Sequence, residues 1–164
     1  MVRKDYEASL GLARAGGDRG HGPLDWAQLR YDSAGVEMMD WSTVKFFRRE
    51  EFACPCGACG GPPVEPQEAL VKDLELIREA WGEPIHITSG VRCAAHNKAV
   101  GGAPDSAHLT GWAVDVSITD SVARYEFMTF AIHTFHRIGL GETLYHLDRD
   151  PSRPARVLWL YKGK

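Results

Sequence analysis

The sequence predicts an α+β fold, a single compact domain in which helices pack on a small, mainly antiparallel sheet. Residues 66–81 and 121–136 carry apolar side chains at helical spacing, and short apolar stretches between and after them are typical of strands. The 164 residues, 44% of them hydrophobic, are enough to bury one sizeable core. A formal net charge of −3, without a long Lys/Arg run, gives no reason to expect nucleic-acid binding.

We divide the chain into an N-terminal extension or docking arm, residues 1–45, and a domain, residues 46–164. Residues 13–22 are rich in Gly, Arg and Asp, a composition typical of a loop or linker. The extension also carries apolar side chains that could dock on the domain or on a partner: Trp26, Leu29, Tyr31, Val36, Met38 and Trp41. No apolar run approaches the ~20 residues that span a membrane, and no signal-type stretch follows the N-terminus. We therefore expect synthesis in the cytoplasm without a signal peptide.

Two helices and four strands are predicted within the domain. In the helix at 66–81 the apolar positions are Leu70, Leu74, Ile77 and Trp81, and Gly82 follows as a stop signal. Ser121 can cap the helix at 121–136, whose stripe of Tyr125, Met128, Ile132 and Phe135 is predicted to face the core. The predicted strands are residues 84–89, 113–118, 144–148 and 157–161.

Alternation in two of these strands places candidate metal ligands on polar faces. In one strand Asp115 alternates with aliphatic residues, so its carboxylate points away from the apolar layer. In another, His146 and Asp148 share a face, which sets a ligand beside a possible acid/base. His108 lies in a glycine-rich loop before the first of these strands. Two histidines and one carboxylate leave a fourth position of a tetrahedral zinc open, which is typical of a catalytic site. The sequence therefore indicates a zinc hydrolase.

A longer series of motifs surrounds these residues. It runs Ser-Gly-x-Arg at 89–92, Asn97, Val-Gly-Gly at 100–102, Ser-x-His-x-x-Gly-x-Ala-x-Asp at 106–115, and Gly-x-Gly at 139–141 before His-x-Asp at 146–148. Over about residues 46 to 161 the chain resembles the M15 family of zinc D,D- and L,D-peptidases. The resemblance is closest to small phage and bacterial cell-wall members that are similar to D-Ala-D-Ala carboxypeptidases.

The resemblance implies a fold like that of hedgehog and D-Ala-D-Ala-peptidase domains, with zinc bound by His108, Asp115 and His146. It further implies that Arg92 lies near a substrate carboxylate and that Ser106 contacts the metal or stands behind one of its ligands. The implied activity is hydrolysis of peptide bonds in the stem peptides or cross-links of bacterial peptidoglycan, as by an endolysin. Such an enzyme would act at the cell wall or periplasm after lysis or pore release, or as a virion component whose extension contacts a phage particle or another protein.

The general base departs from the pattern of several branches of the family. These carry a carboxylate three residues before the last histidine ligand, where this chain has Thr143. Glu142 and Asp148 are the rival acid/base candidates, and Asp148 could instead orient a ligand from behind. The missing carboxylate also motivates an alternative function, a non-catalytic zinc-containing module that binds peptidoglycan or forms part of a virion.

The four cysteines are clustered in the sequence. Cys54, Cys56 and Cys59 form a Cys-x-Cys-x-x-Cys run, and Cys93 directly follows Arg92. This set has the right ligand number for a second, structural zinc, but it could also form disulfides in an oxidising compartment or stay reduced. In each interpretation the cysteines tie their loop to the loop of Arg92.

Overall fold

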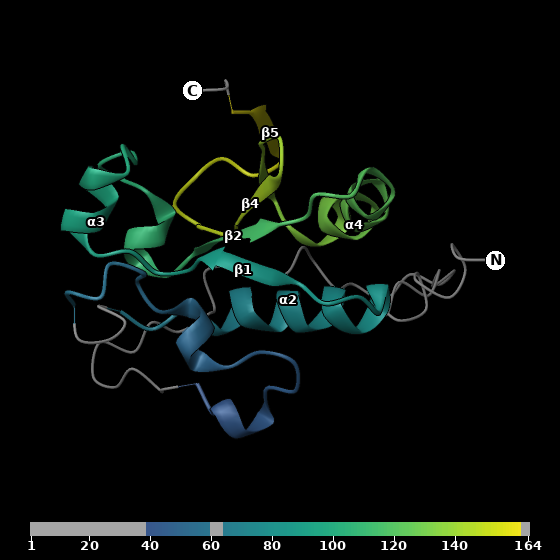
Figure 1. Cartoon of the computed structure of the whole chain (residues 1–164), viewed down its shortest axis with the longest axis horizontal. Coiled ribbons are helices and arrows are strands. Elements are labelled where there is room, and N and C mark those ends of the chain that lie inside the picture. The colour runs from purple at the N-terminus through teal and green to yellow at the C-terminus, as the bar shows by residue number, and fades with distance from the viewer. Residues whose placement is uncertain (1–38, 60–63, 162–164) are drawn as a thin grey trace, which may run out of the picture. The chain divides into compact units, whose positions relative to one another are not determined.

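Residues 39–59 and 64–161 are described by the computed structural model in Figure 1. The apolar residues of the extension from Trp26 to Met38 lie outside this range. Trp41 lies within it, and its ring packs on that of Phe52 with centroids 5.7 Å apart. In the described part of the chain, no helix has both the length and the apolar character needed to cross a membrane.

Helix α2 (Glu68–Trp81) forms where the apolar spacing predicts a helix, starting two residues later than expected. Leu70, Leu74 and Ile77 are fully buried, as predicted, so one stripe of the helix faces the core. Gly82 ends the helix in the left-handed conformation, with φ 86°, which only glycine adopts without strain.

Helix α4 (Ser121–Thr134) is confirmed as a helix but differs from the prediction in cap and face. Asp120, rather than Ser121, is the N-cap, because its carboxylate accepts hydrogen bonds from two backbone N–H groups of the first turn, at 2.9 and 3.0 Å. The predicted core stripe is wrong for Tyr125 and Ile132, which are 75% and 50% exposed, whereas Phe135, directly after the helix, is buried as predicted. The buried residues of the helix are Phe127, Phe130, Ala131 and Thr134. Apolar residues occur on both faces of this helix, so spacing alone could not select the buried one.

The sheet has five strands in the order β1-β2-β4-β3-β5 (Figure 1). Their bounds are His86–Ser89 (β1), Ala113–Ser117 (β2), Arg137–Leu140 (β3), Leu144–Asp148 (β4) and Val157–Leu160 (β5). All neighbours pair antiparallel except β3 and β5, which are parallel, so the predicted mainly antiparallel sheet is confirmed. Strand β3 was not predicted; the sequence suggested that the preceding helix ran through His136. The short helix α3 (Ala94–Ala99) was not predicted either, and it lies at the opposite end of the sheet from α4 in Figure 1.

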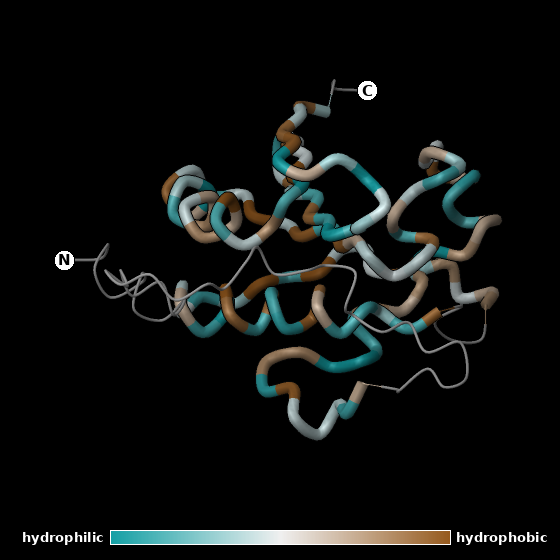
Figure 2. Tube along the Cα trace, turned by 180° about the vertical axis from the view of Figure 1, so that it is seen from behind, coloured by the Kyte–Doolittle hydropathy of each residue, from teal (hydrophilic) through white to brown (hydrophobic). Residues whose placement is uncertain are grey.

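The register gives the sheet one apolar and one polar face. Val114 on β2 pairs with Leu147 on β4, and both are fully buried. Tyr145, on the same face of β4, packs edge-on against Phe127 of α4, with ring centroids 5.1 Å apart. In Figure 2 brown residues alternate with pale and teal ones along α2 and along the strands in the middle of the domain. The helices therefore cover the apolar face, and the side chains between these positions point to the other.

An ion pair joins α2 to the segment after β4. Nη1 of Arg149 lies 2.8 Å from a carboxylate oxygen of Asp73. Burial raises the pKa of Asp73 to about 6 from 3.8, although the charge of Arg149 opposes the shift. The folded state therefore holds the proton of Asp73 more tightly than the unfolded chain does. The contribution of this proton to the free energy of unfolding is complete below about pH 4 and is lost as the pH rises through about 6.

We expect Asp73→Asn to change this pH dependence. Asparagine stays neutral, so from about pH 4 to about pH 7.5 the free energy of unfolding of the variant should rise relative to that of the wild type, by on the order of 1–3 kcal/mol. Urea unfolding of both proteins at several pH values measures this difference, in which other titrating groups cancel. A constant difference across the range would show that Asp73 titrates normally.

Candidate metal centre

His108 is held from behind by a backbone carbonyl. It lies in a short 3₁₀ helix, Ala107–Thr110, and its side chain is almost fully buried. Its Nδ1 is 2.6 Å from the carbonyl oxygen of Gly90. A carbonyl can only accept, so Nδ1 carries the proton and donates it, and the lone pair of Nε2 is directed into the centre.

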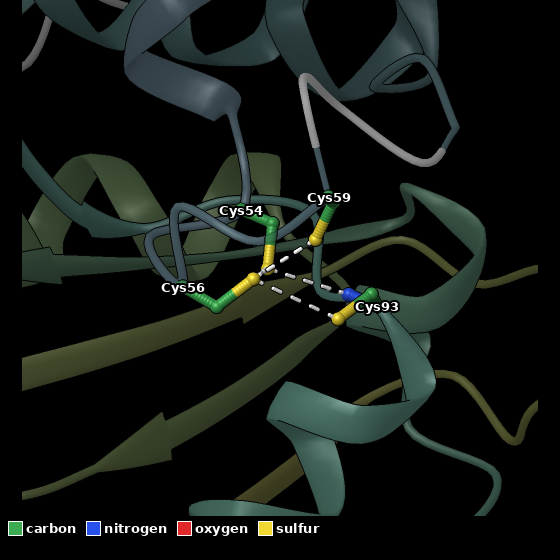
Figure 3. Close-up of side chains that lie close together, drawn as sticks. All are labelled: Cys54, Cys56, Cys59 and Cys93. Carbon is green, nitrogen blue, oxygen red and sulfur yellow. Dashed lines mark hydrogen bonds between the residues drawn. The ribbon is translucent and has the colours of Figure 1, made fainter.

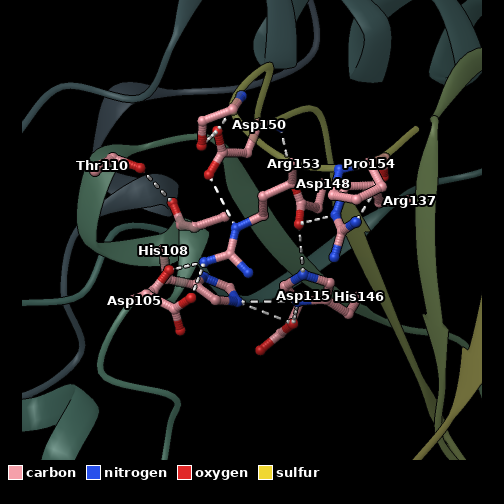
Figure 4. A network of polar contacts seen from close by, with 12 residues as sticks. Asp105, His108, Thr110, Asp115, Arg137, His146, Asp148, Asp150, Arg153 and Pro154 are labelled. Atoms are coloured by element: carbon pink, nitrogen blue, oxygen red, sulfur yellow. Dashed lines mark hydrogen bonds and ion pairs between the residues drawn. The ribbon is translucent and has the colours of Figure 1, made fainter. Parts of the chain in front are cut away.

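Asp115 and His146 face one another across paired strands. Asp115 of β2 and His146 of β4 are direct partners in the antiparallel register. Nδ1 of His146 lies 2.9 Å from Oδ1 of Asp115, and Nε2 of His108 lies 3.2 Å from the same oxygen. The two histidine nitrogens are 3.2 Å apart. Figure 4 shows the three side chains pointing toward one another.

These three donor atoms fit a zinc ion. Zinc binds histidine nitrogen and carboxylate oxygen at about 2.0–2.2 Å, which places the ligands of a tetrahedral site about 3.3 Å apart. The separations of 2.9–3.2 Å among the nitrogen and oxygen donors are close to that value. Neutral imidazole and carboxylate are also the ligand types that zinc takes in catalytic sites. The structure therefore brings together the three side chains that the sequence predicts as zinc ligands.

Asp148 lies behind His146 rather than beside the open position. Its Oδ2 is 3.7 Å from Nε2 of His146, on the side of the ring away from Asp115 (Figure 4). The same oxygen accepts a hydrogen bond of 3.0 Å from Nε of Arg137, and Oδ1 accepts one of 2.7 Å from the backbone N–H of Asp150. Asp148 is only 2% exposed. This arrangement suits a group that keeps the proton of His146 on Nε2 and leaves Nδ1 free to bind metal.

The guanidinium of Arg92 contacts the other oxygen of Asp115. Its Nη2 donates to Oδ2 of Asp115, and its Nε donates to Oγ of Ser89 at 2.8 Å. Both charged side chains are largely buried. The residue predicted to hold a substrate carboxylate is thus also a partner of a candidate metal ligand.

Burial and mutual contact shift the pKa values of the centre in different directions. Burial lowers the pKa of His108 and outweighs the favourable effect of Asp115. Burial also disfavours the charged form of His146, but hydrogen bonds with Asp115 and Asp148 outweigh it and raise its pKa. For Asp115, burial opposes ionisation, yet the two histidines hold its pKa well below the ordinary range. These contacts favour a proton on His146 beside the Asp115 carboxylate, and a metal bound at Nδ1 would take the place of that proton.

The remaining predicted site residues lie near the ends of neighbouring elements. Ser106 directly precedes the 3₁₀ helix of His108, and its side chain does not cap that helix. Glu142 and Thr143 occupy the exposed turn between β3 and β4, ahead of the strand that carries His146. Glu142 is therefore not part of a regular strand.

Two aromatic rings flank His146, and no motif in the sequence pointed to either of them. Trp159 lies on β5 and Tyr161 directly follows it, with ring centroids 5.4 and 6.4 Å from that of His146. Gly139 leaves room for them, since a Cβ there would lie 2.6 Å from the Trp159 ring. Burial, and next the charge of Asp115, raise the pKa of Tyr161, which nevertheless remains 47% exposed. A sequence signal for these two rings would be the pairing of Gly139 with Trp159, and this pairing can be inferred only once β3 is known.

Two arginines that the sequence did not single out form ion pairs around the centre. Arg137 pairs with Asp148 and lies over the Trp159 ring, 5.5 Å from its centroid. Arg153 joins Asp150 to Asp105, each at 3.1 Å, and so links the loop after β4 to the loop that leads into His108 (Figure 4). Their partners come from the register and the loop path, which no local motif encodes.

We expect each of His108→Ala, Asp115→Ala and His146→Ala to lose one equivalent of bound zinc relative to the wild type. Two remaining ligands bind weakly, because the metal is then held by fewer bonds. Elemental analysis after dialysis measures the loss, and His86→Ala, which removes an exposed histidine of β1, is the matched control. Full zinc retention in all three variants would contradict the ligand set.

The comparison with protein families agrees with the geometry. The family model Peptidase M15 matches residues 45–147, well over half of the chain, and this range includes all three candidate ligands. A comparison with curated proteins gave no match. On the family match, this chain belongs to the peptidase M15 family.

Proposed function

We propose that the protein is a zinc-dependent peptidase that hydrolyses peptide bonds in the stem peptides or cross-links of bacterial peptidoglycan. One observation carries the proposal: three donor atoms converge within 3.2 Å, and His108 and His146 are each oriented by a separate partner behind the ring. Three protein ligands leave one tetrahedral position open, which suits a catalytic rather than a structural metal. Membership of a peptidase family supports the same reaction class.

Zinc held by His108, Asp115 and His146 would supply a Lewis acid that polarises a scissile carbonyl and makes water a stronger acid. The protein's own contribution is orientation. The Gly90 carbonyl holds His108 in one tautomer, and Asp148 does the same for His146. The phenol of Tyr161, partly exposed beside His146, can donate a hydrogen bond to negative charge that develops on a substrate oxygen.

Arg92 is the residue that we propose for substrate recognition. A guanidinium is permanently charged and can bind a carboxylate through two parallel N–H donors. Nη2 and Nε of Arg92 already donate to Asp115 and Ser89, and these bonds hold the guanidinium in place. A substrate carboxylate would bind the N–H groups that remain. Ser106, just before His108, is the second candidate for substrate contact.

Amide hydrolysis also needs a group that accepts a proton from water and returns one to the leaving nitrogen. Asp148 and Glu142 remain the two candidates. The buried contacts of Asp148 with Arg137 and His146 favour an orienting role for it, whereas Glu142 is exposed in the turn before β4. We therefore favour Glu142 as the proton acceptor and Asp148 as the residue that positions His146.

The alternative function is a zinc-containing module that binds peptidoglycan, or forms part of a virion, without cutting a bond. Thr143 supports it, because the position three residues before His146 bears no carboxylate. In either case we propose action at the cell wall or periplasm, after lysis or pore release or as a virion component, with residues 1–45 as the arm that contacts a particle or another protein.

Incubation of the protein with purified peptidoglycan separates the two functions. We expect the wild type to release new amino groups, identified by mass spectrometry of the fragments, and we expect His108→Ala to release none. The exposed His86→Ala variant should behave as the wild type. Sedimentation of both proteins with peptidoglycan but no release of amines would select the binding module instead.

A second test concerns Arg92→Lys. We expect this variant to stay folded and to bind zinc, but its kcat/KM on a peptide with a free carboxylate should fall about 10–100-fold relative to the amidated peptide, because Lys lacks the paired donors. If Arg92 acts only through Asp115, both peptides should lose the same factor and their ratio should stay at the wild-type value.

A third test separates the two carboxylates. Asp148→Asn should weaken zinc binding by roughly 10–100-fold, because an outer partner of a metal-binding histidine is impaired. Glu142→Gln should leave zinc affinity unchanged and lower kcat by about 10²–10⁴-fold. Zinc affinity measured by competition with a chelator, together with kcat, distinguishes them. The opposite pattern would exchange the two roles.

A further inference from the structure

The four cysteines meet at the end of the sheet where β1 leads into α3. Cys54, Cys56 and Cys59 come from one loop, and Cys93 immediately precedes α3 (Figure 3). Sγ of Cys56 lies 3.5 Å from that of Cys54, 2.9 Å from that of Cys59 and 3.9 Å from that of Cys93. All four sulfur atoms lie within 4.8 Å of one another, and none is bonded to another.

We propose that Cys54, Cys56, Cys59 and Cys93 bind a structural zinc ion, distinct from the metal of the histidine centre. Zinc binds thiolate sulfur at about 2.3 Å, so the sulfurs of a tetrahedral site lie about 3.8 Å apart. The sulfur separations of 2.9–3.9 Å allow that arrangement with small side-chain adjustments. Four protein thiolates leave no open position, so this ion holds structure and performs no chemistry.

Backbone groups stabilise the sulfurs in the form that zinc requires. The N–H of Ala58 donates to Cys56 at 3.4 Å, that of Cys93 to Cys54 at 3.5 Å, and that of His96 to Cys93 at 3.3 Å. Hydrogen bonds to ligand sulfurs offset the negative charge of a tetrathiolate site and fix the ligands in orientation. Three of the four sulfurs therefore already have a partner of the kind that surrounds a metal.

The site fastens the loop on which the histidine centre depends. Beside the cysteines, the N–H of Val91 donates to the carbonyl of Phe52 at 2.8 Å, and a side chain on Gly90 would collide with the Phe52 backbone. The carbonyl of Gly90 in turn accepts a hydrogen bond from Nδ1 of His108, and Arg92 contacts Asp115. A zinc that joins Cys93 to the loop of Cys54 thus restrains the backbone that orients a ligand and its arginine partner.

The proposal does not rest on the hydrolytic function, because the two metals can be counted separately. The full-length protein is purified with a phosphine reductant after growth with added zinc, and zinc per chain is measured by elemental analysis. We expect two zinc ions in the wild type, one in His108→Ala, one in Cys59→Ser and none in the double variant. If only the cysteines bind metal, the wild type holds one ion and His108→Ala retains it, which leaves this proposal intact.

Cobalt substitution identifies the ligands without altering any cysteine. Cobalt bound by thiolates gives an intense near-ultraviolet charge-transfer band, and the chain has only these four cysteines, so the band can come from no other site. We expect the band in His108→Ala, where it reports a folded thiolate site even if a cysteine variant fails to fold. Cys59→His, which preserves a zinc-binding side chain, should keep the metal with a shifted spectrum.

Two results would overturn the proposal. The first is the absence of a thiolate band in cobalt-loaded His108→Ala, with four thiols that react with an alkylating agent without prior chelation, which indicates simple reduced cysteines. The second comes from a parallel purification without the reductant: a denatured mass lower by two hydrogens per bridge, with no zinc in His108→Ala, indicates disulfides.

Discussion

The largely buried carboxylate of Asp115 is the group on which the rest of the centre depends. Transfer of a carboxylate from water to the interior costs several kcal/mol, so the fold must keep positive charge around it. Arg92 supplies one permanent charge at Oδ2. At Oδ1 the second charge would come from a protonated His146, whose pKa Asp115 and Asp148 raise, or from a metal in place of that proton. A bound cation is therefore a substitute for a proton that the fold already accommodates.

The sheet delivers these groups through its register. Ser89, Asp115, His146, Gly139 and Trp159 form one row across the five strands, on the face opposite the helices. Directly paired residues bring their side chains within about 5 Å, so the row sets Arg92's partner Ser89, two candidate ligands and an aromatic ring side by side. Glycine in the fourth place opens the space that the rings of Trp159 and Tyr161 fill.

Local patterns predicted the parts of the molecule whose structure is decided locally. Helix α2 and the strands of Asp115 and His146 follow from periodicity, because one face of each must be buried. Periodicity did not predict the buried face of α4, because both faces of this helix carry apolar residues. The buried face is the one on which Phe127 packs against Trp81 and Tyr145. Strand β3 could not be predicted for a similar reason. It has four residues, one of them a glycine, and such a short segment becomes a strand only by pairing with β4.

The candidate site divides in the same way. His108, Asp115 and His146 could be selected by residue type and alternation, and Arg92 by the resemblance of its motif. The groups that orient them could not, because the Gly90 carbonyl and Arg137 become partners through loop path and strand register. The sequence thus predicted which side chains could bind metal, but it left Asp148 open between an acid/base and a residue that orients a ligand from behind.

The segment from Gly90 to Cys93 connects the cysteine cluster to the histidine centre. It has no helix or strand of its own, yet Gly90 faces His108, Arg92 faces Asp115 and Cys93 joins the thiols. An irregular segment that must hold a ligand tautomer and a charge to within tenths of an ångström needs restraint from outside. Val91 supplies one restraint, because its side chain is buried and its N–H donates to the carbonyl of the buried Phe52 at 2.8 Å. Ligand bonds from Cys93 to a metal can add a second restraint at the end of the segment that leads into α3.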